Sequence, residues 1–280
     1  MKYTIGLYEK AMPDTLSWKE KLALAKESGY DFVEISIDES DAKLARLDWT
    51  GAERAALIND MLEVGLPIRS MCLSGHRKFP LGSNDPAVRE RSLEIAQKAV
   101  DLASDLGVRI IQLAGYDVYY EDSNEDTLRF FAENLAKMVE MASAKGILLG
   151  FETMETEFMD TVTKAMKYCD LLNSPYLGVY PDCGNLNNAA LKYGHDILDD
   201  LERGRGHIVA MHLKETEPGK YRNMLFGQGL VDFDKVVKKA LDLKINRFVT
   251  EFWYLGGENF NEEIAQQNKI MRKQLDRFYK

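Results

Sequence analysis

Four residues that can bind a divalent cation each close a short apolar segment in the second half of the chain. They are Glu152 in LLGFE, Asp182 in LGVYPD, His212 in HIVAMH and Glu251 in RFVTE. Successive members are 30, 30 and 39 residues apart, close to one strand plus one helix each. Three carboxylates and one imidazole suit Mn²⁺, Mg²⁺, Co²⁺ or Zn²⁺. We therefore expect one divalent metal ion, of undecided identity, and carboxylates that can also transfer protons.

Each of the four residues has a simpler interpretation on its own. A glutamate at a strand end is commonly a surface charge, and His212 can equally be a hydrogen-bonded core histidine. The metal hypothesis depends on all four standing at the same level of successive strands, because the carboxyl ends of the strands in a parallel barrel open onto one face. His207 begins its segment, so we expect it on the opposite face.

Short apolar segments alternate with longer amphipathic ones along the chain. Helical periodicity is clear over residues 18–28, 51–64, 85–106 and 126–145, each followed by a glycine that can end a helix. Eight strand–helix repeats without a linker predict a single closed (β/α)8 barrel of the α/β class over residues 1–280. The expected strands are residues 4–8, 31–37, 67–74, 108–115, 147–152, 176–182, 207–213 and 247–252.

An open, doubly wound sheet is the alternative architecture. It would need a glycine-rich phosphate-binding turn after the first strand. The residues there are Tyr8-Glu9-Lys10-Ala11, which contain no glycine. The sequence therefore favours the barrel.

Composition narrows the functional classes. The 280 residues are 45% hydrophobic and 29% charged, with a net charge of −9, so we expect a sizeable core and no nucleic-acid partner. The three cysteines are odd in number and form no CxxC pair, which suits a reducing compartment. We see no secretory signal and no apolar run of about 18 residues. A cytoplasmic protein without membrane contact is the expectation.

A basic loop follows the third expected strand, in the sequence SGHRKFPLGS. Ser74, His76 and Arg77 offer a hydroxyl, an imidazole and a guanidinium on the catalytic face, and Lys10 follows the first strand. Cations together with backbone N–H groups are what a phosphate monoester needs. The loop is therefore a candidate phosphate site, with a solvated basic loop as the alternative interpretation.

Further polar residues follow other strands. Asn185 stands three residues after Asp182, where it can bind a substrate hydroxyl or simply form a turn. Lys214 and Arg222 lie past the seventh strand and are further candidates to bind the substrate or its phosphate. Three tyrosines after the fourth strand can wall a sugar or merely pack: Tyr116, Tyr119 and Tyr120.

Several long motifs resemble one family from end to end of the chain. They are YEKAM, FVEISIDE, MCLSGHRKFPLGS, IQLAGYDVYY, YPDCGN, HIVAMHLKET, FGQGLVDF and VTEFW. The chain resembles the L-ribulose-5-phosphate 3-epimerases, also called L-xylulose-5-phosphate 3-epimerases, of the xylose isomerase-like barrel superfamily. The resemblance implies a homodimeric pentulose 5-phosphate epimerase of the pathways that degrade L-ascorbate and related sugar acids.

The resemblance also assigns the metal ligands, with one departure. Glu152 corresponds by position to the first metal-binding glutamate of the family, and the other three ligand candidates complete the set. Glu155 and Glu157 follow closely, where the family has an aspartate and an uncharged residue. We choose Glu152 as the ligand because it closes the apolar strand.

These assignments suggest a mechanism of proton transfer. Glu152 and Glu251 would flank the substrate, one removing the C3 proton and the other returning a proton to the opposite face through a cis-enediolate. The metal ion would act as a Lewis acid, and Asp182 and His212 would mainly hold it.

Four other functions stay open. A 3-epimerase of non-phosphorylated ketoses would share the barrel, the metal and the glutamates. An aldose–ketose isomerase would act at C1 and C2 instead. A metal-dependent barrel acting on abasic DNA would need more than the four histidines of this chain. A non-catalytic sugar-binding barrel would not need the candidate catalytic carboxylates.

Overall fold

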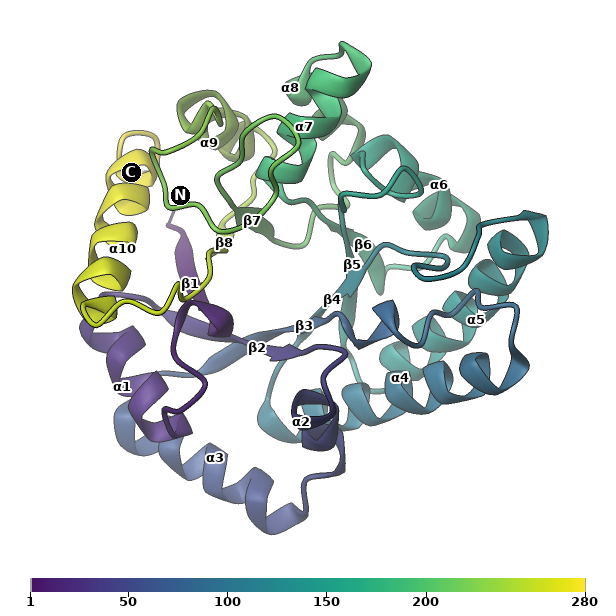
Figure 1. The fold of residues 1–280 in the computed structure, drawn as a ribbon, viewed down its shortest axis with the longest axis horizontal. Helices are drawn as coiled ribbons and strands as arrows, with labels where there is room; N and C mark the ends of the chain where they lie inside the picture. The colour runs from purple at the N-terminus through teal and green to yellow at the C-terminus, as the bar shows by residue number, and fades with distance from the viewer. Residues whose placement is uncertain (1, 280) are drawn as a thin grey trace.

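The strands form a ring at the centre of the molecule, and the helices surround it (Figure 1). A computed structural model describes residues 2–279. The strands are β1 (Thr4–Tyr8), β2 (Phe32–Ile37), β3 (Ile68–Leu73), β4 (Ile110–Ala114), β5 (Leu148–Glu152), β6 (Leu177–Tyr180), β7 (Met211–Leu213) and β8 (Arg247–Thr250).

All eight strands run parallel in the order β6-β5-β4-β3-β2-β1-β8-β7. Between β6 and β7 the described residues form only isolated pairs, Val179 with Ile208 and Asp182 with His212. The sheet is therefore a nearly closed barrel. The predicted (β/α)8 fold is confirmed, and the open, doubly wound alternative is wrong.

The helices lie outside the strand ring (Figure 1). The four predicted from periodicity begin and end within one residue of the observed bounds. The α-helices are α1 (Trp18–Glu27), α2 (Asp41–Leu44), α3 (Gly51–Val64), α4 (Pro86–Leu106), α5 (Glu125–Ala144), α6 (Val162–Leu172), α7 (Cys183–Tyr193), α8 (Ile197–Arg203), α9 (Phe233–Asp242) and α10 (Phe260–Asp276). Three short 3₁₀ turns are η1 (Glu9–Ala11), η2 (Ala45–Asp48) and η3 (Gly75–Arg77). No helix within residues 2–279 is long and apolar enough to cross a bilayer.

Local signals explain where several helices begin and end. Ser17 and Thr50 each form a capping box with the glutamate three residues on, which satisfies free N–H groups at the start of α1 and α3. Gly65 and Gly107 end α3 and α4 with φ of 71° and 75°, a left-handed conformation that costs glycine little.

Strands β6 and β7 are shorter than predicted. β6 ends at Tyr180 because Pro181 has no N–H to donate to a ladder, so Asp182 lies just beyond the strand and caps α7. β7 contains only three residues, although residues 207–213 were expected to be extended. These ends bring Asp182 and His212 into the isolated pair that links β6 to β7.

The barrel interior contains both apolar and polar side chains. Gly6 has no Cβ, and the space is filled by the Phe32 ring, which would lie 2.3 Å from a Cβ at that position. Glu34 and Gln112 are fully buried further along their strands. An apolar cluster inside the barrel consists of Tyr8, Phe32, Cys72, Ile110, Tyr180, Ala210 and Val249.

A buried carboxylate, Glu9, ties the segment after β1 to the segment after β2. Arg46 donates two hydrogen bonds to it, of 2.6 and 2.7 Å, and the ammonium groups of Lys43 and Lys21 lie at 2.6 and 3.0 Å. The backbone N–H of Ser36 also donates to it. Burial alone would raise the pKa of the Glu9 carboxyl, but Arg46, with the two lysines, holds the pKa well below its usual range.

We predict that Glu9→Gln lowers the free energy of unfolding by about 3–5 kcal/mol, because it leaves three largely buried cations without their shared anion. Urea denaturation at pH 7 measures this change. Glu63→Gln is the matched control, since Glu63 pairs with Lys19 on the exposed surface and its loss should cost less than about 1 kcal/mol. Equal losses in the two variants would contradict the structural role of Glu9.

Candidate active site

The four predicted metal ligands converge at the carboxyl ends of the strands. Glu152 is the last residue of β5, Asp182 follows β6, His212 is the middle of β7, and Glu251 follows β8. One ligand atom from each lies within 4.8 Å of the others. All four side chains are buried. The expected convergence of these residues is confirmed.

The spacing and chemistry of these donors fit a divalent cation. The Nδ1 atom of His212 is 2.9 Å from Glu251 Oε2, 3.5 Å from Glu152 Oε1 and 3.8 Å from Asp182 Oδ2. Within the described chain, Asp182 Oδ2 is buried and makes no hydrogen bond, although the Lys214 ammonium lies 3.0 Å away. Buried carboxylates in such proximity repel one another unless a cation lies between them. This cluster can therefore hold a metal ion.

The pKa values of Asp182 and His212 also reflect the crowding of carboxylates in this cluster. Burial raises the pKa of the Asp182 carboxyl, and the nearby Glu251 raises it further against the opposing charge of Lys214. Burial alone would lower the pKa of His212, but the charges of Glu34 and Glu251 raise it well above its usual range. The contributions of the neighbouring carboxylates to both shifts reflect negative charge that a divalent cation would offset.

Two buried polar residues that the sequence analysis did not select support the ligands. Glu34 Oε1 lies 2.6 Å from Nε2 of His212, and Tyr180 donates a hydrogen bond of 2.9 Å to the other oxygen of Glu34. Gln112 donates a hydrogen bond to Glu152. The Glu34 contact leaves Nδ1 of His212 facing the cluster, which is the usual arrangement of a histidine ligand.

A pocket opens above the ligand cluster, and we call it the central pocket. Its lining contains six of the seven predicted substrate-binding residues. The lining residues are Tyr8, Lys10, Cys72, Ser74, Arg77, Glu152, Met154, Glu155, Asn185, Lys214, Tyr221, Arg222, Glu251 and Trp253. A larger and more open hollow of about 570 Å³ lies outside the barrel beside α6 and α8, away from the ligand cluster.

Comparison with known proteins identifies the family. The model of the xylose isomerase-like TIM barrel family matches residues 22–279. The L-ribulose-5-phosphate 3-epimerase UlaE of Escherichia coli (strain SMS-3-5 / SECEC) is 49% identical over 272 residues, which cover 97% of this chain and 94% of that protein. This chain belongs to the L-ribulose-5-phosphate 3-epimerase family. It is an enzyme, a carbohydrate epimerase of the isomerase class.

Other relatives agree with this assignment. The putative L-ribulose-5-phosphate 3-epimerase SgbU of Escherichia coli (strain K12) is 49% identical over 280 residues, covering 98% of this chain and 96% of that protein. Among solved structures, an L-ribulose 3-epimerase superposes with a TM-score of 0.78 at 19% identity, covering 99% and 95% of the two chains. A D-tagatose 3-epimerase-like protein gives 0.81 at 16% identity, covering 98% and 97%. At these identities the solved structures establish the fold alone.

Polar residues near the ligand cluster have atoms available to a substrate. The amide nitrogen of Asn185 donates to the carbonyl of Thr153 at 2.7 Å, whereas its side-chain oxygen is buried without a hydrogen-bond partner in residues 2–279. Lys214 is buried, and its ammonium lies 3.5 Å from Glu251 Oε2. This placement joins Lys214 to the carboxylate cluster rather than to the pocket mouth.

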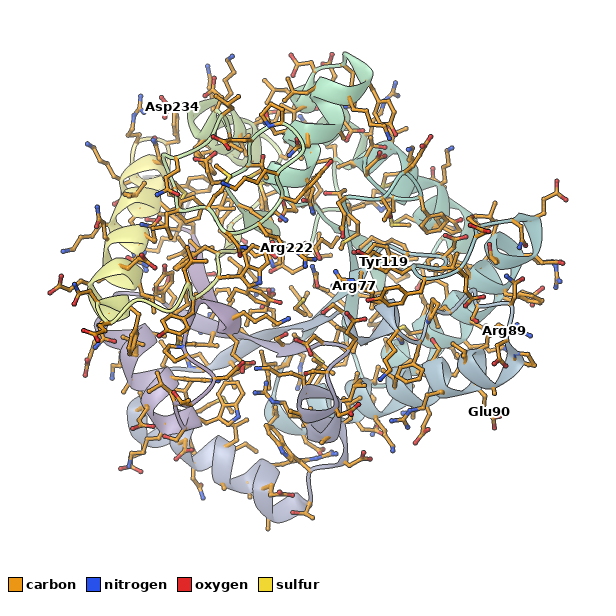
Figure 2. All side chains as sticks on the ribbon, in the orientation of Figure 1. Arg77, Arg89, Glu90, Tyr119, Arg222 and Asp234 are labelled. Atoms are coloured by element: carbon orange, nitrogen blue, oxygen red, sulfur yellow. The ribbon has the colours of Figure 1, made fainter. Side chains whose placement is uncertain are left out.

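The cations predicted to bind phosphate lie nearer the pocket mouth, where Figure 2 shows Arg77 and Arg222 near the middle of the view. Arg77 donates a hydrogen bond of 3.1 Å to the Tyr116 hydroxyl, and its guanidinium lies 4.9 Å from the centre of the Tyr119 ring. Arg222 lies 5.7 Å from a Trp253 ring. Lys10 forms an ion pair with Asp38.

The structure places His76 apart from the other six substrate-binding candidates, which line the central pocket. Its side chain is 3% exposed and its Nε2 atom lies 3.1 Å from the carbonyl oxygen of Ser92 in α4. The 3₁₀ turn η3 directs His76 toward α4, while its neighbour Arg77 lines the central pocket. Burial lowers the pKa of His76 to about 4.

We predict that His76 destabilises the fold in acid. Its pKa in the folded state is about 4, below the usual 6.5, so the unfolded chain binds a proton first as the pH falls. His76→Gln keeps an N–H donor for Ser92 but removes this titration. Between pH 7 and pH 4.5, this proton uptake should lower the unfolding free energy of the wild type by about 2–3 kcal/mol. The variant should not show this part of the loss. Urea denaturation at both pH values measures this difference, and a difference of zero would contradict it.

The choice of Glu152 over its acidic neighbours agrees with the placement of all three residues. Glu152 is in the four-residue cluster. Glu155 lines the mouth of the central pocket, where its carboxylate lies 2.9 Å from the Tyr116 hydroxyl. The Glu157 side chain is 78% exposed and lies 3.6 Å from Lys192. The loop after β5 therefore presents its three glutamates to three different environments.

Proposed function

We propose that this enzyme catalyses the metal-dependent 3-epimerisation of a pentulose 5-phosphate, interconverting L-ribulose 5-phosphate and L-xylulose 5-phosphate. The observation that carries the proposal is the buried cluster of three carboxylates and one histidine beneath a pocket lined by two of those carboxylates. Relatives that share 49% of their residues with this chain are named as L-ribulose-5-phosphate 3-epimerases, which supports the substrate class.

Glu152, Asp182, His212 and Glu251 would hold the metal ion. A divalent cation bound there supplies Lewis acidity that polarises the ketose carbonyl and acidifies the neighbouring C–H. His212 is oriented for this role by its contact with Glu34. Asp182 has one buried oxygen that makes no hydrogen bond within the described residues.

Inversion at C3 needs one group to remove a proton and another to deliver a proton to the opposite face. Glu152 and Glu251 come from β5 and β8, which are not adjacent in the barrel, and both line the central pocket. We assign them as the proton-transferring pair, with a cis-enediolate of the sugar between the two transfers. Gln112 holds Glu152, and His212 holds Glu251 at 2.9 Å.

Other residues of the central pocket would position the sugar. The Lys214 ammonium is a buried positive charge beside Glu251, where it can stabilise negative charge that develops on a substrate oxygen. The free side-chain oxygen of Asn185 can accept a hydrogen bond from a hydroxyl. Ser74, Lys10, Arg77 and Arg222 line the pocket and provide donors and positive charge for the phosphate.

Two rival functions remain, each with a distinct outcome in one assay. Incubating the metal-loaded enzyme with L-ribulose 5-phosphate in D₂O and following its protons by NMR tests the proposal. Exchange of the C3 proton with appearance of L-xylulose 5-phosphate is the expected result. Exchange at C1 would indicate an aldose–ketose isomerase, and exchange only with the free ketose would indicate an epimerase of non-phosphorylated sugars.

We predict that Glu152→Gln and Glu251→Gln each reduce C3 exchange by at least about 10²-fold, because each removes a proton acceptor and a charged ligand. The same NMR assay, run with metal content measured on each variant, tests this. Glu157→Gln is the control, because the Glu157 side chain is exposed and is not among the described residues that line the central pocket. Wild-type rates in either ligand variant would rule out the two-glutamate assignment.

We also predict that Arg77→Ala raises KM for the phosphorylated sugar by about 10–100-fold, which corresponds to the loss of one charge-assisted hydrogen bond. The KM for the free sugar should change much less, because that substrate has no phosphate to contact. Steady-state kinetics with both sugars measures the two effects. An equal change for both would remove Arg77 from the phosphate site.

We propose that residues 1–280 act as one catalytic unit, which the family match over residues 22–279 supports. We propose a cytoplasmic homodimer on the family resemblance, and sedimentation of the purified protein measures its oligomeric state. A role in L-ascorbate degradation follows from the same resemblance, and growth of a deletion strain on L-ascorbate tests it.

A further inference from the structure

Glu155 lies at the mouth of the central pocket among side chains from three loops. Its carboxylate accepts hydrogen bonds from Tyr116 at 2.9 Å and Tyr119 at 3.4 Å, both in the loop after β4. Arg77, after β3, lies 4.0 Å away, and Arg222, after β7, lies 3.8 Å away. One carboxylate therefore stands between the two arginines that are candidates for phosphate binding. Figure 2 shows Arg77, Tyr119 and Arg222 near one another in this region.

The contacts with both arginines are loose. Direct hydrogen bonds between guanidinium and carboxylate groups are typically about 2.7–2.9 Å. Both arginine distances to Glu155 exceed this, and Glu39 lies 3.9 Å from the other terminal nitrogen of Arg77. Arg77 Nε is buried and has no hydrogen-bond partner in the described part of the chain. The arginine charges are thus balanced by carboxylates, while hydrogen-bond donors remain available.

We propose that Glu155 is an internal counter-ion that competes with the phosphate of the substrate for Arg77 and Arg222. This inference rests on the proposed phosphate site. A phosphate dianion has more charge and one more free oxygen than a carboxylate, so it can displace Glu155 and engage the unused guanidinium donors. A sugar without phosphate cannot replace the counter-ion.

The competition has a second consequence. Without Glu155 the two arginines would form a more positive mouth that binds any small anion, including inorganic phosphate. With Glu155 in place, a bound anion must first overcome the attraction between the arginines and the carboxylate. A substrate whose sugar also binds deeper in the pocket has additional binding energy for this step, whereas free phosphate does not. Glu155 therefore lowers the affinity of the mouth for both ligands, and inorganic phosphate, which has no further contacts in the pocket, is the one that no longer occupies it.

Binding of inorganic phosphate to the metal-loaded enzyme tests the inference by isothermal titration calorimetry at low ionic strength. Glu155→Gln removes the charge and keeps the size of the side chain. We expect it to bind inorganic phosphate about tenfold more tightly than wild type, since one nearby negative charge is lost. Glu157→Gln makes the same charge change two residues away on an exposed side chain and should bind within about twofold of wild type. Arg77→Gln should abolish the binding.

The variants separate failure of this inference from failure of the proposed phosphate site. Unchanged or weaker phosphate binding by Glu155→Gln, with binding lost in Arg77→Gln, would overturn the counter-ion role and leave the phosphate site intact. Equal tightening in Glu155→Gln and Glu157→Gln would also overturn it, because the effect would then be one of overall charge. Full binding by Arg77→Gln would overturn the phosphate site itself and this inference with it. Thermal unfolding of each variant confirms that the fold is retained.

Discussion

The repulsion among three buried carboxylates at one end of the barrel is the constraint on which the surrounding structure depends. Glu152, Asp182 and Glu251 all have an oxygen within a few ångströms of His212. In a low-dielectric interior such charges interact strongly, so they need a cation close by. Lys214 supplies one positive charge, and the geometry leaves room for a divalent ion to supply the rest.

This constraint extends inward along the strands. A ligand must be held in one orientation, and the polar groups that hold it must themselves have partners. Glu34 orients His212 and is in turn held by Tyr180, while Gln112 holds Glu152. The interior of the barrel therefore contains polar side chains beneath the ligands, level with apolar neighbours such as Tyr8 and Cys72. The need to hold the ligands thus accounts for Glu34 and Gln112 inside the barrel core.

The fold and the metal ligands could be predicted from the sequence more fully than the residues that hold those ligands in place. Ligand positions were readable because an apolar run that stops at Glu152, or that contains a single histidine at His212, is visible in one chain. Glu34 and Gln112 were missed, although a single polar residue inside the runs FVEISI and IIQLA was a usable signal. Which of His76 and Arg77 would face the pocket could not be predicted, because a 3₁₀ turn and the packing of α4 decide it.

The pocket mouth differs from the ligand cluster in the elements that carry its charged groups. Its charged groups come from loops, which can change without disturbing the strands that carry the ligands. Three separate loops carry Arg77, Glu155 and Arg222, which meet only in the folded protein. No local sequence motif therefore reveals that their charges balance. The proposed proton transfer at C3 would use the rigid strand ends, whereas the proposed recognition of the phosphate tail would use these adjustable side chains. A barrel of this family can therefore retain its chemistry while its preference for one sugar derivative changes at the mouth.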